Sequence, residues 1–345
     1  MVTTRSELDQ DDYRIIRALQ LAPREGFARL GEVLGVSEAT VARRYRRLRQ
    51  AGVLHVAGVV DPAALGQSEW VVRVRCRPDS TPAIAEALAV RDDVGWVSLN
   101  AAGSEVTCAL RSRSEADREH LLVELLPRVA TVLDITASVV MHVFSTGCTR
   151  DWTALEVALT PQETLALGGA VSRRPPQPPT TLQPQDEAIL SALAADGRAT
   201  HVELATAADI SPARAARRVQ ALLESGVLHL DVALSRAALG FTTRADLWLQ
   251  VAPSAVRAVG KELSAMPEVA FAAGISGTHN MHAAVSCRTL EDLFGFVTDR
   301  IGALDGVRVV EVSPVLRQLK QFNTPMTGNR LTAPRPKKPS TRRPG

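Results

Sequence analysis

The chain repeats itself at a constant spacing of 174 residues. Aligned without a gap, residues 8–66 and 182–240 share 21 identities over 59 positions, many more than unrelated segments would share by chance. Self-similarity at one long spacing indicates a duplicated structural unit. With 345 residues the chain is also too long for one ordinary domain. We therefore predict two copies of the same domain arrangement in one polypeptide.

Each copy begins with the pattern of three short helices. In the first copy, Asp9 is an N-cap residue before an apolar stripe, and residues 23–26 (Pro-Arg-Glu-Gly) end that helix. A second helix follows and ends at Gly35, and Ser37 is the N-cap of a third helix that ends at Gly52. Two helices, a tight turn and a third helix are the order of a helix-turn-helix.

The third helix concentrates arginine on its surface. Five arginines fall within seven residues, while Val41, Tyr45 and Leu48 recur at helical spacing and form a stripe that can be buried. Thr40 and the arginines at 43, 44 and 47 fall on one arc beside this stripe, and the other two lie on the far side. Guanidinium groups bind phosphates and guanine edges, although a solvated basic face paired to nearby acids is the alternative. The candidate DNA contacts are Ser37, Thr40, Arg43, Arg44, Arg46 and Arg47.

The second copy keeps a smaller version of this helix. Ser211 and Pro212 are an N-cap and a proline at the first helical position, and Ala221 stands where the first copy has Arg47. With fewer arginines this helix either binds DNA more weakly or mainly positions the protein. Its candidate contacts are Ser211, Arg214, Arg217 and Arg218.

A strand–helix–strand–strand–helix–strand pattern follows each helical unit. In the first copy the expected strands are 72–76, 94–99, 106–110 and 132–144, with helices at 81–90 and 114–129. In the second they are 245–251, 269–275, 279–285 and 307–316, with helices at 255–264 and 290–301. The predicted fold class is α+β: two copies of a three-helix helix-turn-helix domain followed by a ferredoxin-like βαββαβ effector domain.

These patterns divide the chain into six expected segments. A proline-rich stretch near residues 172–181 separates the copies, and a brief helix capped at Thr160 precedes it. The basic, proline-rich end is expected to be disordered. The segments are helix-turn-helix 1 (1–62), effector domain 1 (63–148), a linker (149–181), helix-turn-helix 2 (182–236), effector domain 2 (237–322) and a basic tail (323–345).

This arrangement resembles the Lrp/AsnC family of leucine-responsive and asparagine-related bacterial regulators. In the first copy the resemblance rests on Leu8, Asp9, Asp12, Ile16, Leu19, Leu30, Gly35, Val36, Ser37, Val41, Arg43, Arg44, Leu48, Gly52, Val53 and Leu54. In the second it rests on Leu182, Asp186, Leu190, Leu193, Leu204, Ile210, Ser211, Pro212, Arg217, Arg218, Leu222, Gly226, Val227 and Leu228. It covers residues 8–144 and 182–320, as if two family members were fused head to tail.

The resemblance implies a bacterial transcription regulator that binds double-stranded promoter DNA and senses a small molecule. Family members pair through their effector sheets, usually between chains, and often assemble into larger rings. Here the two halves are expected to pair within one chain, and a homo-oligomer of such chains is expected.

The resemblance also suggests where an effector would bind. Family effector domains usually carry a glycine followed shortly by aspartate between the second and third strands, where an amino acid is held near the pairing interface. The first copy lacks that aspartate, and Asn280 stands near its place in the second. For an amino acid or similar effector, the candidate residues are Gly103, Ser104, Glu105, Gly277, Thr278 and Asn280.

Composition argues against several other classes. The four cysteines are scattered without a C-x-x-C pair, so we expect no metal or other cofactor. No apolar run reaches the roughly 18–20 residues of a membrane span, which favours a cytoplasmic protein with no membrane partner. The net charge is +3, and residues 323–345 alone carry six basic residues and no acid. The rest therefore carries −3, so any DNA-binding charge there must be local.

Siroheme decarboxylases, which share this fold and occur as fused pairs, are the enzyme alternative. They tend to carry His, Tyr and Arg near the effector-domain strands, whereas here His279 and His282 are the only hint. Because no nucleophile–base grouping appears, we expect no catalytic residue and no enzyme activity. A regulator that has lost DNA binding is a third alternative, which the arginine face argues against. His55 and His229 repeat each other and are expected at a hairpin rim or in packing, rather than in a metal or catalytic site.

Overall fold

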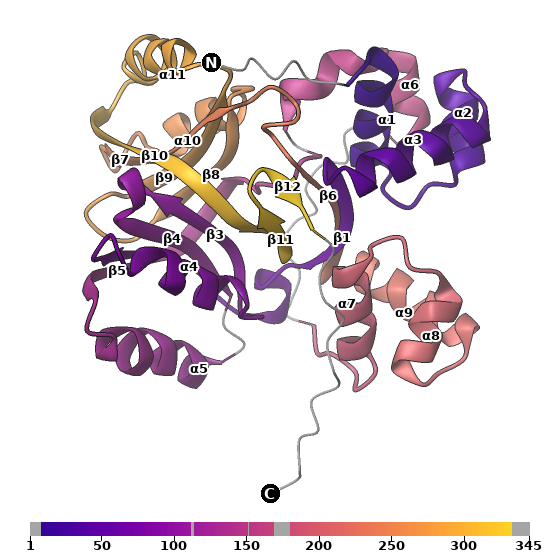
Figure 1. Cartoon of the computed structure of the whole chain (residues 1–345), viewed down its shortest axis with the longest axis horizontal. Coiled ribbons are helices and arrows are strands. Elements are labelled where there is room, and N and C mark those ends of the chain that lie inside the picture. The colour runs from indigo at the N-terminus through magenta and orange to yellow at the C-terminus, as the bar shows by residue number, and fades with distance from the viewer. Residues whose placement is uncertain (1–7, 112–113, 151, 169–179, 333–345) are drawn as a thin grey trace, which may run out of the picture.

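The computed structural model of the chain describes residues 8–111, 114–150, 152–168 and 180–332. Each half begins with three helices, as predicted, and the two helical units lie side by side on one flank of the molecule (Figure 1). Each third helix has its serine N-cap, since Ser37 accepts from the backbone N–H of Thr40 and Ser211 from that of Arg214. The six helices are α1 (Gln10–Leu21), α2 (Phe27–Leu34), α3 (Glu38–Gln50), α7 (Asp186–Ala195), α8 (His201–Ala208) and α9 (Pro212–Glu224).

Both effector domains have the predicted βαββαβ order. In the first, the elements are β2 (Glu69–Cys76), α4 (Thr81–Ala89), β3 (Val94–Asn100), β4 (Glu105–Arg111), α5 (Glu115–Glu119) and β5 (Val132–Ser145). In the second, they are β7 (Thr243–Val251), α10 (Val256–Ser264), β8 (Val269–Ile275), β9 (Met281–Cys287), α11 (Leu290–Gly295) and β10 (Val307–Gln321). The last helix of each domain continues as one wider π-helical stretch, His120–Leu125 and Phe296–Ile301. The α+β prediction is confirmed.

The two effector domains join into one closed ring of eight strands. The long strands β5 and β10 each pair first with their own domain and then with the other, β5 with β2 and β8, β10 with β7 and β3. The ring order is therefore β3-β4-β2-β5-β8-β9-β7-β10, closing back on β3. The expected intramolecular pairing of the effector domains is thus present within a single chain.

Each effector sheet has one apolar face and one mixed face. On β2, Val72, Val74 and Cys76 alternate into a core covered by helices, and β7 buries Leu247 and Leu249 in the same way. The intervening residues point the other way, toward the opposite half of the ring. This second interior contains polar side chains from both halves.

Two strands that the sequence patterns did not identify join the helical units. β1 (Leu54–Val60) and β6 (Leu228–Leu234) follow α3 and α9 and pair antiparallel as a two-stranded ribbon. Ala57 is paired with Asp231, which lies 174 residues later, so an approximate two-fold axis passes between them. His55 lies buried on β1, whereas its counterpart His229 on β6 is half-buried.

The structure corrects two expected segment boundaries. The first part of the linker is not a spacer, because Trp152, Leu155 and Leu159 pack into the core of helix-turn-helix 1, and α6 (Pro161–Ala166) begins with the predicted Thr160 cap. Residues 324–331, expected in the disordered tail, form a hairpin of β11 (Thr324–Thr327) and β12 (Arg330–Leu331). The hairpin is held against the protein because the Leu331 side chain is buried and its backbone N–H donates a hydrogen bond to the carbonyl of Gly52. The proline-rich stretch 169–179 and the tail 333–345 lie outside the described residues.

Candidate functional site

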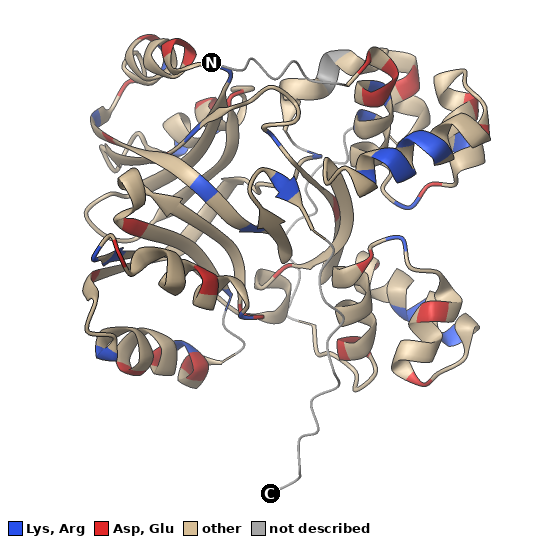
Figure 2. Cartoon of the chain, viewed as in Figure 1, with Lys and Arg blue, Asp and Glu red and all other residues tan. Residues whose placement is uncertain are grey.

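The outer face of α3 presents an arginine-rich surface to solvent. Val41, Tyr45 and Leu48 are buried beneath it, as the helical spacing predicted. Figure 2 shows the basic residues of α3 gathered on one side of the first helical unit. A shallow open groove there is lined by Ala39, Thr40, Arg43, Arg46, Arg47 and Gln50.

The arginines of this face differ in how they are held. Arg43 is exposed and has no hydrogen-bond or ion-pair partner among the described residues. Arg46 is exposed and donates from Nε to the carbonyl of Ala42, 3.2 Å away. Arg47 forms an ion pair with Asp12 but keeps about half of its side chain exposed. Arg46 lies in the groove with Arg43 and Arg47, rather than on the far side.

Arg44, expected on the DNA-facing arc, is turned inward. Its guanidinium contacts Asp9, Asp11 and Asp12 at 2.7–3.1 Å, and only 15% of its side chain is exposed. The hydrogen bond from Arg44 lowers the pKa of the Asp9 carboxyl and raises that of the guanidinium. Arg44 therefore ties α3 to the first turn of α1. Helical spacing placed Arg44 on the arc, but the acids at the start of α1 draw it away.

The second helical unit repeats this arrangement with fewer charges. Arg218 is paired with Asp186 at 2.7 Å, the same lock that Arg44 makes with Asp12 174 residues earlier. Arg214 and Arg217 are exposed on α9, beyond its Ser211 cap, and no described residue pairs with either. The free basic face of α9 is thus smaller than that of α3.

Several contacts fix the two helical units relative to each other. The β1–β6 ribbon joins them, and Arg49 at the end of α3 forms an ion pair with Asp196 at 2.7 Å. Arg24 and Arg198 exchange hydrogen bonds with the opposite unit. Sequence inspection missed this pair, although Arg24 and Arg198 are identical residues 174 positions apart.

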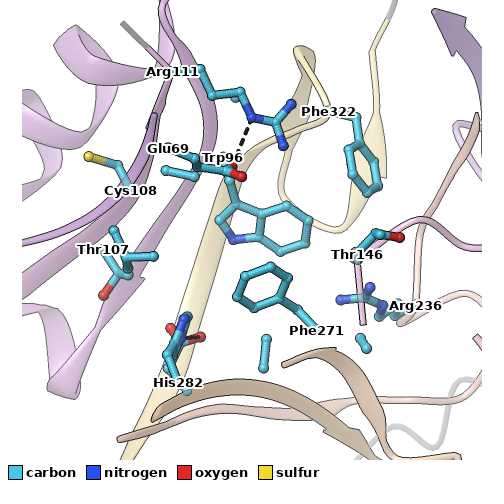
Figure 3. Close-up of a pocket in the computed structure, with 17 residues that line it drawn as sticks. Glu69, Trp96, Thr107, Cys108, Arg111, Thr146, Arg236, Phe271, His282 and Phe322 are labelled. Atoms are coloured by element: carbon cyan, nitrogen blue, oxygen red, sulfur yellow. Dashed lines mark hydrogen bonds and ion pairs between the residues drawn. The ribbon is translucent and has the colours of Figure 1, made fainter. Parts of the chain in front are cut away.

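A cavity of about 60 Å³ lies inside the strand ring, with walls from both effector domains (Figure 3). Its apolar wall includes Trp96 from β3, Phe271 from β8 and Phe322, the residue after β10. Its polar lining is mostly paired within the protein. Glu69 accepts from Arg111 at 2.8 Å, and Asp246 contacts His282 at 3.1 Å.

Arg236 is the exception in this lining. It follows β6 and is only 4% exposed, yet none of its nitrogens has a hydrogen-bond or carboxylate partner among the described residues. Its guanidinium lies 5.6 Å from the ring of Trp96 and 5.3 Å from that of Trp152. Burial, and then the nearby charge of Arg244, lowers the pKa of Arg236 to about 10. No sequence pattern singled out Arg236, since the first copy has Pro62 at the equivalent position.

The residues expected to bind an effector lie elsewhere. None of the six lines this cavity. Glu105 is buried in an ion pair with Arg73, and the Asn280 side chain bonds both backbone groups of Val251. The two turns lie against the long strands of the opposite half, Gly103 beside Leu316 and Gly277 beside Ser138. The remaining candidates, Ser104 and Thr278, belong to these same turns.

Neither a metal centre nor a membrane span is present among the described residues. They contain no group of three or more His, Cys, Asp or Glu side chains arranged to hold a metal ion. No helix among them has the length and apolar character that crossing a membrane requires.

Three segments match known family models. Residues 8–49 match the AsnC-type helix-turn-helix domain, and residues 182–228 a winged helix-turn-helix DNA-binding model. Residues 245–325 match the Lrp/AsnC ligand-binding domain. Both helical units and the second effector domain are therefore recognised independently, as expected for a tandem arrangement.

Curated relatives match about one copy of the duplicated unit. An uncharacterised helix-turn-helix-type transcriptional regulator of Pyrococcus abyssi is 30% identical over 138 residues, covering 87% of that protein and 40% of this chain. The regulator LrpA of Pyrococcus horikoshii is 28% identical over 137 residues, which cover 97% of LrpA and 39% of this chain. A helix-turn-helix-type transcriptional regulator of Mycobacterium tuberculosis is 36% identical over 102 residues, which cover 67% of that protein and 28% of this chain. Relatives from archaeal Pyrococcus species do not support the narrower expectation of a bacterial source.

The whole-chain architecture also has a solved counterpart. The crystal structure of a siroheme decarboxylase aligns with 90% of this chain, and the alignment includes 93% of the decarboxylase chain. The TM-score is 0.61 and the sequence identity is 15%. This likeness shows that the tandem fold exists in another protein, but at 15% identity it does not indicate an activity for this chain.

Proposed function

Because the chain belongs to the Lrp/AsnC family, we propose that it is a DNA-binding transcription regulator with two unequal recognition helices and a small-molecule effector. The observation that carries this proposal is the outer face of α3. There Arg43, Arg46 and Arg47 project from a helix whose opposite side is buried in the core.

This face has the chemistry of a major-groove contact. Guanidinium groups form charge-assisted hydrogen bonds with phosphate oxygens, and one that reaches a guanine edge bonds it bidentately. Ser37 and Thr40 at the start of α3 add hydroxyl groups where recognition helices commonly meet bases. Arg44 and Arg218 hold the helices in place in this proposal, and Arg214 and Arg217 make the contacts of α9 beside Ser211.

Two fixed recognition helices call for two half-sites. In helix-turn-helix dimers such half-sites lie about 34 Å apart, one turn of DNA. Because α3 and α9 present different side chains, the preferred operator should be an imperfect palindrome. The first helix would supply most of the affinity, and the second would mainly set the register.

The enzyme alternative has less support. The cavity in the ring, at about 60 Å³, is smaller than the roughly 150 Å³ cavity that accommodates benzene, and a tetrapyrrole is far larger than benzene. His282 is bonded to Asp246 and stacked on Trp248 at 4.2 Å, and His279 lies 3.6 Å from Glu311. We therefore propose a regulator and not a decarboxylase.

Assembly beyond one chain is a further part of the proposal. The effector domains already pair within the chain, so a larger assembly would use outward surfaces. Leu133, Met141 and Leu316 on the long strands are more than 60% exposed and suit such a contact. Light scattering after size exclusion gives the number of chains directly.

The decisive experiment is a gel shift with the Arg43→Ala/Arg46→Ala protein on its own promoter region at stated salt. We expect a loss of affinity and a salt slope lower by about 0.9 for each phosphate contact removed. Arg217→Ala should have a smaller effect, and Arg257→Ala, an exposed residue on α10, is the matched control. Unchanged binding by the Arg43/Arg46 variant would overturn the assignment of the DNA face.

A further inference from the structure

Arg236 is a buried cation without a counter-ion. The nearest acids, Asp231 and Asp246, are held by other groups: Asp231 accepts from the backbone and hydroxyl of Thr149, and Asp246 from Asn100 and His282. Arg244 adds a second, half-buried guanidinium, which donates to the neutral side chain of Gln318. A buried charge is unfavourable unless it is paired, so this arrangement invites an anion.

The free guanidinium meets the cavity at one end. Figure 3 shows Arg236 beside Thr146 on one side of the cavity, and His282 with Thr107 on the opposite side. Thr107 Oγ1 and His282 Nδ1 are also buried without a hydrogen-bond partner among the described residues. Because His282 Nε2 faces the Asp246 carboxylate, Nδ1 is available as an acceptor. The space between is walled by Trp96, Phe271 and Phe322.

Resting on the proposed function as an effector-responsive regulator, we propose that this cavity is the effector site and binds a small monocarboxylate. The carboxylate pairs with Arg236, and the short apolar body packs on Trp96, Phe271 and Phe322. The cavity of about 60 Å³ is smaller than the roughly 150 Å³ cavity that accommodates benzene, so the ligand must be small. Propionate, lactate, pyruvate and alanine are among the smallest carboxylates with an apolar body. The site is separate from the turns at Gly103 and Gly277 and from the DNA face.

A carboxylate fits this site better than phosphate does. The planar fork of one guanidinium bonds both oxygens of a carboxylate, and its single positive charge is neutralised by a monoanion. A phosphate dianion would retain an unpaired negative charge among aromatic side chains and beside the Glu69 and Asp246 carboxylates. Hydroxyl or amino groups on the ligand could reach the acceptor of His282.

Ligand-induced thermal stabilisation of the full chain, together with tryptophan fluorescence, tests the proposal without DNA. The probes are propionate, lactate, pyruvate and alanine at about 10 mM, a concentration that nearly saturates even a site with a Kd of about 1 mM. Propionamide is the neutral isostere of propionate, and inorganic phosphate is the other anion. We expect at least one carboxylate to raise the Tm saturably, with propionamide and phosphate inactive. Alanine against pyruvate tells an amino acid effector from an oxo acid.

Variants of Arg236 locate the binding. Arg236→Gln should weaken carboxylate binding about 10- to 100-fold, while the Tm of the free protein stays equal or rises because the unpaired charge is gone. Arg236→Lys keeps the charge without the fork and should bind with intermediate affinity; this variant decides the matter if the glutamine variant does not fold. Arg257→Gln on the surface of α10 is the control.

Three results would overturn the proposal: no stabilisation by any carboxylate, equal stabilisation by propionamide, or undiminished binding by the Arg236 variants. None of them bears on DNA binding through α3, because no DNA is present. Conversely, failure of the Arg43/Arg46 experiment leaves this test unaffected.

Discussion

Arg24 and Arg198 lie 174 positions apart, and each donates two hydrogen bonds to the backbone carbonyls that flank the other. Arg24 reaches Gly197 and Ala199 at 2.9 and 2.8 Å, and Arg198 reaches Pro23 and Glu25 at 2.6 and 2.9 Å. Burial lowers the pKa of both guanidinium groups, and the charge of Arg198 lowers the pKa of Arg24 further. These four reciprocal hydrogen bonds fix the two helical units rigidly relative to each other.

Arg24→Ala should weaken the contact between the two helical units. The variant loses two hydrogen bonds from a charged donor, so we expect a destabilisation of about 1–3 kcal/mol in urea unfolding, reduced by relief of the repulsion between the two guanidiniums. Affinity for an operator with both half-sites should fall, while affinity for an isolated half-site should not change. Arg198→Ala should behave alike, and Arg257→Ala should match the natural protein. An equal loss of affinity for one half-site and for two would show that Arg24 does not control the relative position of the two recognition helices.

The sequence predicted the local elements better than their association. The serine caps at Ser37 and Ser211 and the apolar stripe of α3 are local features, so the helices were found. Strands β1 and β6 were missed, although Leu54–Val60 is largely apolar. Each needs the other as its partner, and no local pattern contains that pairing.

The candidate sites show the same limit. Periodicity identified the exposed Arg43, but it could not tell that Arg44 would turn to acids on α1. The isolated charge of Arg236 is still less visible in the sequence, since it depends on which side chains of distant segments fail to reach it. Burial and pairing are tertiary properties, whereas helix faces are local.

Arg43 and Arg44 are neighbours with different expected roles. Arg44→Ala leaves the fully buried Asp12 with Arg47 as its remaining ion-pair partner, so it should lower the free energy of unfolding by about 1–3 kcal/mol. Arg43→Ala touches no partner and should change stability by less than about 0.5 kcal/mol while weakening DNA binding. Chemical unfolding and gel shifts on both variants separate the roles. Similar stability losses in the two variants would contradict this division.

Gly52 is the position where the C-terminal hairpin meets the end of α3. Its φ is +68°, and an added Cβ would lie 2.6 Å from the carbonyl oxygen of Leu331. Gly35 has the same φ with nothing within 4 Å, so it is a matched control for the backbone term alone. Gly35→Ala should cost about 1–2 kcal/mol for the left-handed conformation. Gly52→Ala should cost clearly more and expose the hairpin to limited proteolysis. Equal unfolding free energies for the two variants would show that the hairpin yields without cost.

His55 should make the protein sensitive to mild acid. Burial, and then the charge of Arg49, lowers the pKa of His55 below its usual 6.5, against weaker opposing effects of Asp196 and the Ala195 backbone. As the pH decreases below about 6.5, the unfolded chain therefore protonates His55 before the folded chain does. The free energy of unfolding falls with decreasing pH over this range.

The expected slope from His55 is up to about 1.4 kcal/mol per pH unit between pH 6.5 and 5. The carboxyls with lowered pKa, including Asp9, Glu163 and Glu311, lose their contribution only below about pH 4.5, outside this window. Urea unfolding of His55→Asn should give a flatter dependence than the natural protein, and the exposed His201→Asn is the control. Parallel curves for all three proteins would mean that His55 is protonated without penalty in the fold.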